Sequence, residues 1–341
     1  MKKKARKKFY KKKALSKKKV IVVLPKSKIV PKDSSMTRLV LPPVVLVSIL
    51  FLTISAYILM QVLIRQTHVP RSPFTYSPLS FPVISLPEAP VLSAESAIIM
   101  DNTSKTILYQ KNPQFRFSMA STTKLTTALV GLSEHALSDV LTVKRVKVEG
   151  VNVGLTIGEQ MRYEDMLYAL LLPSGNDAAY AIADNDPEGS VGFVKKMNEK
   201  AISLGLENTH FGDPAGLEDD EDYTTVKDLV KIMSVAISTP ELATVIGTKQ
   251  KTISDITGIK QYTFSNLNKL LGVNGVTGGK TGTTEGAGEV LVISQVTEGR
   301  TYIIIVMKSS DRFSDTEKLL QLIQENVTLV SPRYPFLPTV K

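Results

Sequence analysis

The chain has 341 residues, no cysteine and a formal net charge of +10. This length accommodates one large domain with additional segments, and the lack of cysteine excludes disulfide bonds and thiolate chemistry. The charge is uneven, because residues 1–38 contain 16 lysines and arginines and one acidic residue, Asp33, for a net +15. Subtracting +15 from +10 leaves −5 for the other residues, so the basic character belongs to this tail alone. A lysine-rich tail can bind nucleic acid, but the segment after it favours a membrane, and we expect no nucleic-acid partner.

An uncharged apolar run follows the tail, from Leu39 to Ile64. It is long enough to cross a bilayer as one helix, and the excess of lysine and arginine before it predicts an N-terminus in the cytoplasm. A cleaved signal peptide is the alternative, but its apolar core is usually shorter and closer to the start of the chain. We therefore expect a cytoplasmic tail (1–38), a single transmembrane helix (39–64) in the cytoplasmic membrane, and an extracytoplasmic remainder.

Residues 65–92 are rich in proline, with prolines at positions 70, 73, 78, 82, 87 and 90. Such a segment predicts an extended, semi-rigid spacer without a core of its own. A folded domain is then expected at residues 93–330, which are enough to bury a sizeable core. Residues 331–341 are expected to be a C-terminal tail.

The pattern of residues 93–330 predicts strands at both ends and helices between them. A hairpin of Ala97–Met100 and Thr106–Tyr109 is expected first, and a β-prone stretch runs over Val140–Gly158. Helices are expected at Tyr163–Leu172, Asp177–Ala183, Val191–Leu204, Thr225–Ile237, Glu241–Ile246 and Asp315–Asn326, and further strands at Val276–Thr284, Glu289–Val296 and Thr301–Met307. The order indicates an α+β fold, with an antiparallel sheet of about five strands from both chain ends and helices packed on it.

The stretch Ser118–Gly131 predicts a short helix with an apolar face, ending near Gly131. Ser121 and Lys124 are three residues apart on it, so the hydroxyl and the amine share one side. A serine becomes a good nucleophile when a neighbouring base takes its proton, and a lysine with a lowered pKa is such a base. The alternative is a capping serine beside a solvated lysine, and the same spacing recurs without meaning at Ser16 in the basic tail.

Two later motifs favour the catalytic interpretation. Ser174-Gly175-Asn176 is the only Ser-x-Asn in the chain, and Lys280-Thr281-Gly282 is the only Lys-Thr-Gly. The order of the three motifs resembles that of penicillin-binding proteins and serine β-lactamases. Further landmarks lie at Ser96–Asp101, Gly212–Leu217, Tyr223–Thr225 and Gly279–Thr284. Together they resemble the low-molecular-mass serine D-alanyl-D-alanine carboxypeptidases (peptidase family S11, β-lactamase/transpeptidase-like fold) from about Ser93 to about Val330.

The resemblance implies catalytic roles for three residues. Ser121 would attack the carbonyl between two D-alanines and form an acyl-enzyme, with Lys124 as the base that takes its proton. Burial and a second ammonium, from Lys280, would lower the pKa of Lys124. Ser174 would relay a proton toward the leaving D-alanine. Asn176 would hydrogen-bond the substrate backbone or Lys124, although it is also placed to cap the next helix.

The resemblance also implies a substrate-binding strand. Lys280 and Thr281 would bind the terminal carboxylate, and Gly282 would let the substrate backbone lie close. The backbone N–H groups of Ser121 and Thr283 would hold the oxyanion. Arg312 would contact the substrate carboxylate as well, or else be a solvated residue at a helix start.

The resulting prediction is a membrane-anchored carboxypeptidase acting on peptidoglycan stem peptides, with β-lactams as covalent inhibitors. No cofactor and no metal are expected, because His68, His135 and His210 lack metal-ligand spacing. The alternatives are a D,D-endopeptidase, a β-lactamase, a penicillin or muropeptide sensor with slow turnover, and a structural protein with an inactive site. A β-lactamase usually needs a deacylating glutamate on a separate loop, and we identify none from the sequence.

Overall fold

The computed structural model describes residues 42–67, 80–85, 88–217 and 220–331. The chain divides into two compact units, Met1–Tyr76 and Ser77–Lys341. The predicted tails, 1–38 and nearly all of 331–341, lie outside the described residues, as do residues 68–79 of the predicted spacer.

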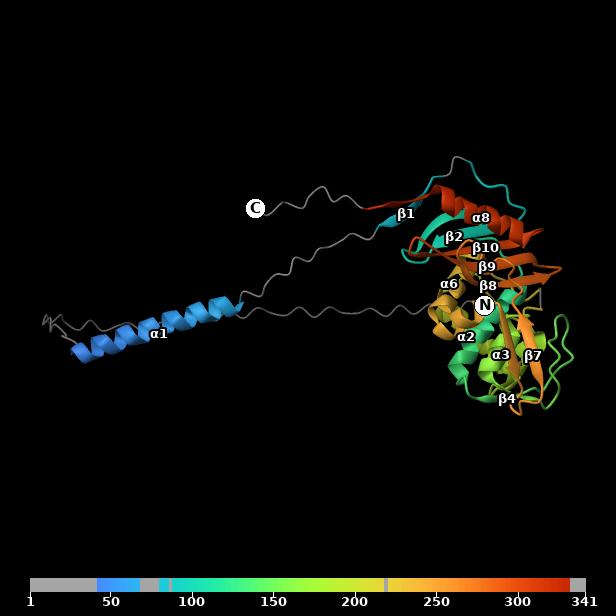
Figure 1. The fold of residues 1–341 in the computed structure, drawn as a ribbon, viewed down its shortest axis with the longest axis horizontal. Helices are drawn as coiled ribbons and strands as arrows, with labels where there is room; N and C mark the ends of the chain where they lie inside the picture. Colours follow the sequence, from blue (N-terminus) through green and yellow to red (C-terminus); the bar gives the residue numbers. More distant parts are fainter. Residues whose placement is uncertain (1–41, 68–79, 86–87, 218–219, 332–341) are drawn as a thin grey trace, which may run out of the picture. The chain divides into compact units, whose positions relative to one another are not determined.

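The first unit contains helix α1, Pro43–Thr67 (Figure 1). Its segment Pro43–Leu63, 21 residues long, is apolar enough to cross a membrane, and its side chains are exposed in the chain by itself. At a rise of 1.5 Å per residue, α1 is about 38 Å long, which exceeds the hydrocarbon thickness of a bilayer. The chain therefore carries one helix suited to a membrane anchor among its described residues.

The second unit is organised around a five-stranded antiparallel sheet in the order β3-β2-β10-β9-β8. Its strands are β2 (Ser96–Asp101), β3 (Thr106–Lys111), β8 (Val276–Thr284), β9 (Gly288–Thr297) and β10 (Arg300–Ser309). The expected sheet from both ends of the chain is thus confirmed. The central strands are buried on both faces, since Ile303 and Ile305 of β10 join one core while Ile304 and Val306 join the other.

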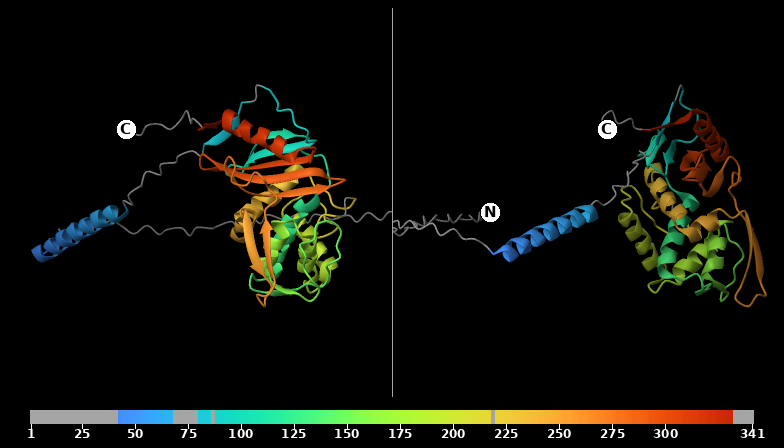
Figure 2. Two further views of the ribbon diagram at one scale, coloured as in Figure 1. Left: turned by 45° about the vertical axis from the view of Figure 1, so that its right-hand side comes forward. Right: turned by 60° about the vertical axis from the view of Figure 1, so that its left-hand side comes forward.

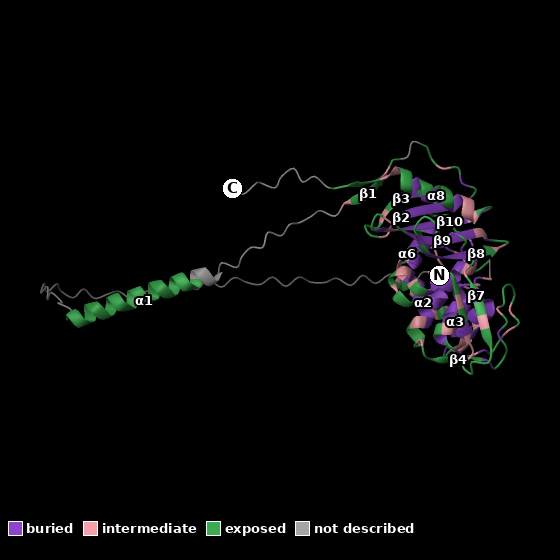
Figure 3. Ribbon diagram, in the orientation of Figure 1, coloured by how far each residue is buried: buried purple, intermediate pink, exposed green. Residues whose placement is uncertain are grey.

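Helices cover the two faces of this sheet (Figures 1 and 2). Helix α8 (Arg312–Asn326) lies on one face, and α6 (Val226–Ser238) leads the group on the other. That group also contains η1 (Ala120–Thr123), α2 (Lys124–Glu134), α3 (Tyr163–Leu171), α4 (Asn176–Asp184), α5 (Gly189–Ser203) and α7 (Pro240–Ile246). Figure 3 shows buried residues concentrated in the sheet and in the helices packed against it. The predicted α+β architecture is confirmed.

In the part of the chain that the structure describes, three strand pairs lie outside the main sheet. They are β1 (Phe81–Ile84) with β11 (Val327–Val330), β4 (Val140–Thr142) with β5 (Gln160–Arg162), and β6 (Gln250–Ser254) with β7 (Gln261–Ser265). The position of β4 is predicted by the β-prone stretch of the sequence, whereas the other five strands are not predicted.

The first of these pairs corrects the predicted spacer, because Phe81–Ile84 belongs to the second unit rather than to a free linker. Arg300 attaches this segment further. Its guanidinium donates to the Ser80 carbonyl and forms a buried ion pair with Asp101 at 2.6 Å. The spacer was predicted from proline content, which does not reveal a pairing partner more than 240 residues away.

Helix α2 corrects a second expectation, because it continues past Gly131 to Glu134. Gly131 is instead required by packing. A Cβ at this position would lie 2.4 Å from the hydroxyl oxygen of Tyr163, the first residue of α3. The glycine therefore marks a close helix–helix contact rather than a helix end.

Candidate active site

Ser121 lies in the short turn η1, directly before α2. Lys124 begins α2 and is fully buried, with its Nζ 2.9 Å from Ser121 Oγ. The same amine donates to the Ala215 carbonyl at 2.7 Å. Ala120, the residue before Ser121, has a φ of 46°, an unfavourable conformation for alanine that surrounding contacts must hold. The expected contact between the serine and the lysine is present.

Burial is the main influence on Lys124. Desolvation of the ammonium lowers the pKa of Lys124 to about 7, against the opposing charges of Asp213, Asp222 and Asp177. An amine with this pKa is partly neutral near neutral pH and can accept a proton. The lysine is therefore not the solvated residue of the alternative interpretation.

Ser174 faces the site from the turn between α3 and α4, with a φ of 69°. Its Oγ accepts a hydrogen bond from Lys280 Nζ at 2.8 Å. Lys280 lies on β8, 106 positions along the chain, and is also buried. The Ser-x-Asn and Lys-Thr-Gly motifs are thus in direct contact.

Lys280 is surrounded by positive groups. Burial first, and then the charges of Lys124 and Arg312, lower the pKa of Lys280 well below its ordinary value. Its amine also donates to the carbonyl of Thr281 at 2.8 Å. The two lysines therefore share a buried environment that disfavours a second positive charge.

Asn176 is the first residue of α4, after Gly175 as N-cap, and its side chain does not cap the helix. Its Nδ2 donates to the Glu149 carbonyl at 2.6 Å, and its backbone N–H donates to Val151 at 2.7 Å. Its Oδ1 is buried and has no hydrogen-bond partner among the described residues. The capping interpretation is wrong, and an acceptor is left at the site.

Gly282 also allows a close approach between two parts of the chain. A Cβ on Gly282 would lie 3.1 Å from the Met119 carbonyl oxygen and 3.2 Å from the Ser121 nitrogen. The absent side chain therefore lets β8 pack directly against the turn that carries Ser121.

Arg312 is the first residue of α8 and is held in place by β8 and β9. Its guanidinium donates to the Gly282 carbonyl at 2.8 Å and to Thr283 Oγ1 at 2.5 Å. Its backbone N–H donates to the Glu289 carboxylate at 2.9 Å. Arg312 is half-buried beside the Lys-Thr-Gly strand, so it is not simply a solvated helix start.

Comparison with known proteins shows the family to which the chain belongs. A family model described as D-alanyl-D-alanine carboxypeptidase, peptidase S11, matches residues 84–311. The chain belongs to the peptidase S11 family. The predicted family and the predicted serine-type D-Ala-D-Ala carboxypeptidase class are confirmed.

Individual relatives agree with this assignment. The chain is 35% identical over 253 residues to a D-alanyl-D-alanine carboxypeptidase of Streptomyces sp. (strain K15), covering 68% of this chain and 87% of that protein. It is 31% identical to a D-alanyl-D-alanine endopeptidase of Pseudomonas aeruginosa, covering 74% and 84%. The crystal structure of the Streptomyces K15 DD-transpeptidase superposes with a TM-score of 0.65 at 33% identity, covering 70% of this chain and 98% of that one.

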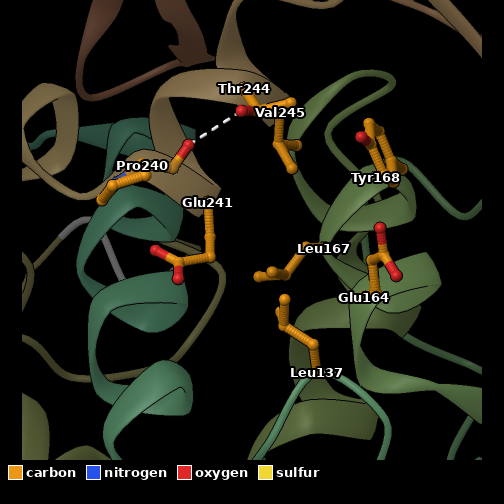
Figure 4. Close-up of a pocket in the computed structure, with 8 residues that line it drawn as sticks. All are labelled: Leu137, Glu164, Leu167, Tyr168, Pro240, Glu241, Thr244 and Val245. Carbon is orange, nitrogen blue, oxygen red and sulfur yellow. Dashed lines mark hydrogen bonds between the residues drawn. The ribbon is translucent and has the colours of Figure 1, made fainter.

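The domain also has a pocket that is separate from the S11 motif residues. That pocket, about 270 Å³, is lined by α3, α7 and the segment after α2 (Figure 4). Its lining includes Glu164, Tyr168 and Glu241 but none of the motif residues. Within the described part of the chain, no group of three His, Cys, Asp or Glu side chains is arranged to hold a metal ion.

The contacts of Ala215 and Asp213 in this S11 domain were not predictable from the sequence, in which Gly212–Leu217 is only a landmark of the family. The contact of the Ala215 carbonyl with Lys124 joins positions 91 residues apart. The one available signal was the segment's Gly-Asp-Pro-x-Gly composition, which is typical of a tight turn.

Proposed function

We propose that this protein is a membrane-anchored D,D-carboxypeptidase that removes the terminal D-alanine from peptidoglycan stem pentapeptides through an acyl-enzyme on Ser121. The observation that carries the proposal is the 2.9 Å contact between Ser121 Oγ and the buried amine of Lys124. It joins a nucleophile to a base whose pKa is near 7. Membership of the S11 family supports the substrate class.

In the proposed acylation, Ser121 Oγ attacks the carbonyl carbon between the last two D-alanines while its proton passes to Lys124. The C–O bond forms, and the negative charge on the carbonyl oxygen is held by the backbone N–H groups of Ser121 and Thr283. The C–N bond then breaks. The proton that Lys124 accepted passes through Ser174 to the leaving amine, so that D-alanine departs and Lys124 is neutral again. Ser174 Oγ lies 2.8 Å from Lys280 Nζ. Water hydrolyses the ester, releases the tetrapeptide and frees Ser121.

The proposed carboxylate site consists of Lys280, Thr281 and Arg312. Lys280 and Thr281 lie on β8, and Arg312 contacts Gly282 and Thr283 of the same strand. A site that binds a free carboxylate places the scissile bond one residue from the peptide end, which is the geometry of an exopeptidase. Asn176 would complete the site, since its unpartnered Oδ1 can accept a hydrogen bond from a substrate N–H.

A D,D-endopeptidase is the second candidate, because two relatives, from Pseudomonas aeruginosa and Escherichia coli, carry that name. Offering the purified protein a pentapeptide ending in D-Ala-D-Ala, a cross-linked dimer and a penicillin separates the candidates by mass spectrometry of the products. We expect loss of one alanine from the pentapeptide. Cleavage of the dimer without alanine loss would support the endopeptidase, and rapid penicillin hydrolysis a β-lactamase. Stable acylation without peptide turnover would support a sensor.

We also propose that α1 is a single-pass anchor in the cytoplasmic membrane, with residues 1–38 in the cytoplasm and the catalytic domain outside. The high positive charge before α1 supports this orientation, and the lysines would attract anionic lipids. Protease added to intact spheroplasts should therefore digest the catalytic domain and leave an N-terminal fragment. Protection of the domain, with digestion only after lysis, would contradict this topology.

A further inference from the structure

A loop between α5 and α6, residues 212–217, is folded around one carboxylate. Asp213 is buried, and its Oδ1 accepts hydrogen bonds from the backbone N–H groups of Ala215 at 2.6 Å and Gly216 at 2.9 Å. Its Oδ2 accepts one from Leu217 at 2.6 Å. Three consecutive N–H groups therefore depend on a single side chain for their direction.

This 212–217 loop contacts the active site at two points. The Ala215 carbonyl accepts a hydrogen bond from Lys124 Nζ at 2.7 Å. Gly216, with a φ of +79°, lies so close to Ala120 that a Cβ on it would be 2.0 Å from the Ala120 carbonyl oxygen. One loop thus contacts both the base and the residue directly before the nucleophile.

A third contact fixes the loop to helix α2. Thr127 Oγ1, one helical turn after Lys124, donates to the Pro214 carbonyl at 2.6 Å. The loop therefore cannot shift relative to Lys124 without breaking a buried hydrogen bond, which is costly.

We propose that Asp213 is a positioning residue for acylation, which folds the 212–217 loop so that the Ala215 carbonyl holds the Lys124 amine beside Ser121. A neutral amine has two N–H donors and one lone pair. With one N–H directed to Ala215, the amine is restrained so that its lone pair can face the Ser121 hydroxyl, the orientation in which it accepts the proton. This inference rests on the proposed roles of Ser121 and Lys124.

The charges around Lys124 make the pH dependence of acylation a test of the role of Asp213. A purely structural role of Asp213 would not change this pH dependence. Asp213, Asp222 and Asp177 oppose the effect of burial on its pKa, whereas Lys280 on β8 is a second buried amine nearby. Removing the negative charge of Asp213 should therefore lower the pKa of Lys124 further. The acylation rate falls at low pH because Lys124 must be neutral to act as the base. This fall, the acid limb of the pH–rate profile, would therefore move to lower pH.

The test is the Asp213→Asn variant of the full-length protein, whose acylation by a fluorescent penicillin is followed across pH. We expect the plateau rate to fall by about 10- to 100-fold, because the Lys124 amine is less well placed, and the acid limb to shift to lower pH. Asp213→Glu keeps the negative charge but moves the carboxylate, because its side chain is one methylene longer. Its acylation rate should therefore fall, while the acid limb of its pH–rate profile stays at the wild-type pH.

The matched control is Asp228→Asn. Asp228 is also buried and accepts a backbone N–H, from Asn208 at 2.7 Å, but it is not among the charges that act on Lys124. We expect the acylation rate and the acid limb of Asp228→Asn to match the wild type.

A wild-type acylation rate and pH profile in Asp213→Asn would overturn the inference, as would a fall in rate without a shift of the acid limb. If Asp213→Asn does not fold, a wild-type rate in Asp213→Glu would overturn it. Labelling that persists in Ser121→Ala would instead overturn the proposed function.

Discussion

Ser121→Ala is expected to abolish D-alanine release, with the turnover number reduced by about 10⁴-fold or more. The variant lacks the oxygen that forms the acyl-enzyme, and Lys124, 2.9 Å away, has no proton to accept from an alanine side chain. Ser121 is half-buried and on a rigid turn, so the loss of one oxygen should leave the fold intact. D-alanine released from a D-Ala-D-Ala pentapeptide measures the effect directly.

Ser133→Ala is the matched control for this prediction. Ser133 lies on the same helix, α2, and its hydroxyl only donates to the Leu129 carbonyl at 3.3 Å. Its replacement should leave the turnover number within about twofold of the wild type, as is usual for a substitution away from the site. Substantial turnover by Ser121→Ala, with Ser133→Ala also active, would show that another residue is the nucleophile.

Lys124→Ala is expected to slow acylation by about 10²- to 10⁴-fold, the range typical of losing a general base. In the wild type, the rate should rise with pH and level off above about 7, because burial lowers the pKa of Lys124 to about 7 and only the neutral amine accepts a proton. The variant should lose this titration. Rapid-mixing measurement of penicillin acylation from pH 5 to 9 gives both results.

Lys124→Met separates loss of the base from loss of packing. Lys124 is among the largest fully buried side chains, so alanine leaves a cavity there. Methionine fills much of that volume but accepts no proton. Slow acylation in both variants supports the base, whereas near-normal acylation in Lys124→Met would show that Lys124 serves only to pack.

The local part of the site was predictable from sequence because it depends on short spacing. Ser121 and Lys124 are three residues apart, and a helical turn brings such positions together whatever surrounds them. The contact of Ser174 with Lys280 spans 106 positions. No sequence periodicity predicts a contact over that separation, so in the sequence only the resemblance to a known family links the two motifs.

Two glycines show why contacts between distant parts of the chain could not be predicted from the sequence. Gly131 and Gly282 were interpreted from local rules, as a helix end and as a site of substrate approach. Gly131 is instead explained by Tyr163 from elsewhere in the chain, and Gly282 has a close contact with the Ser121 turn that the sequence did not reveal. A glycine can indicate that another part of the chain packs closely against it, but the sequence does not identify that part.

The same limit applied to Arg312 and to β1. Arg312 had two possible interpretations, since a helix start suits either a solvated or a substrate-facing arginine, and its contacts with Gly282 and Thr283 contradict only the solvated one. Strand β1 has just four residues and contains a proline, so its pairing with β11 determines its structure more than its own composition does.

The most direct test of the central proposal is to locate the covalent adduct formed with a penicillin. The wild-type protein is labelled with and without an excess of the D-Ala-D-Ala pentapeptide, digested, and analysed by tandem mass spectrometry. The account predicts one adduct, on Ser121, which decreases when the pentapeptide competes. An adduct on Ser174 or another serine, or labelling of Ser121 that the pentapeptide does not reduce, would contradict it.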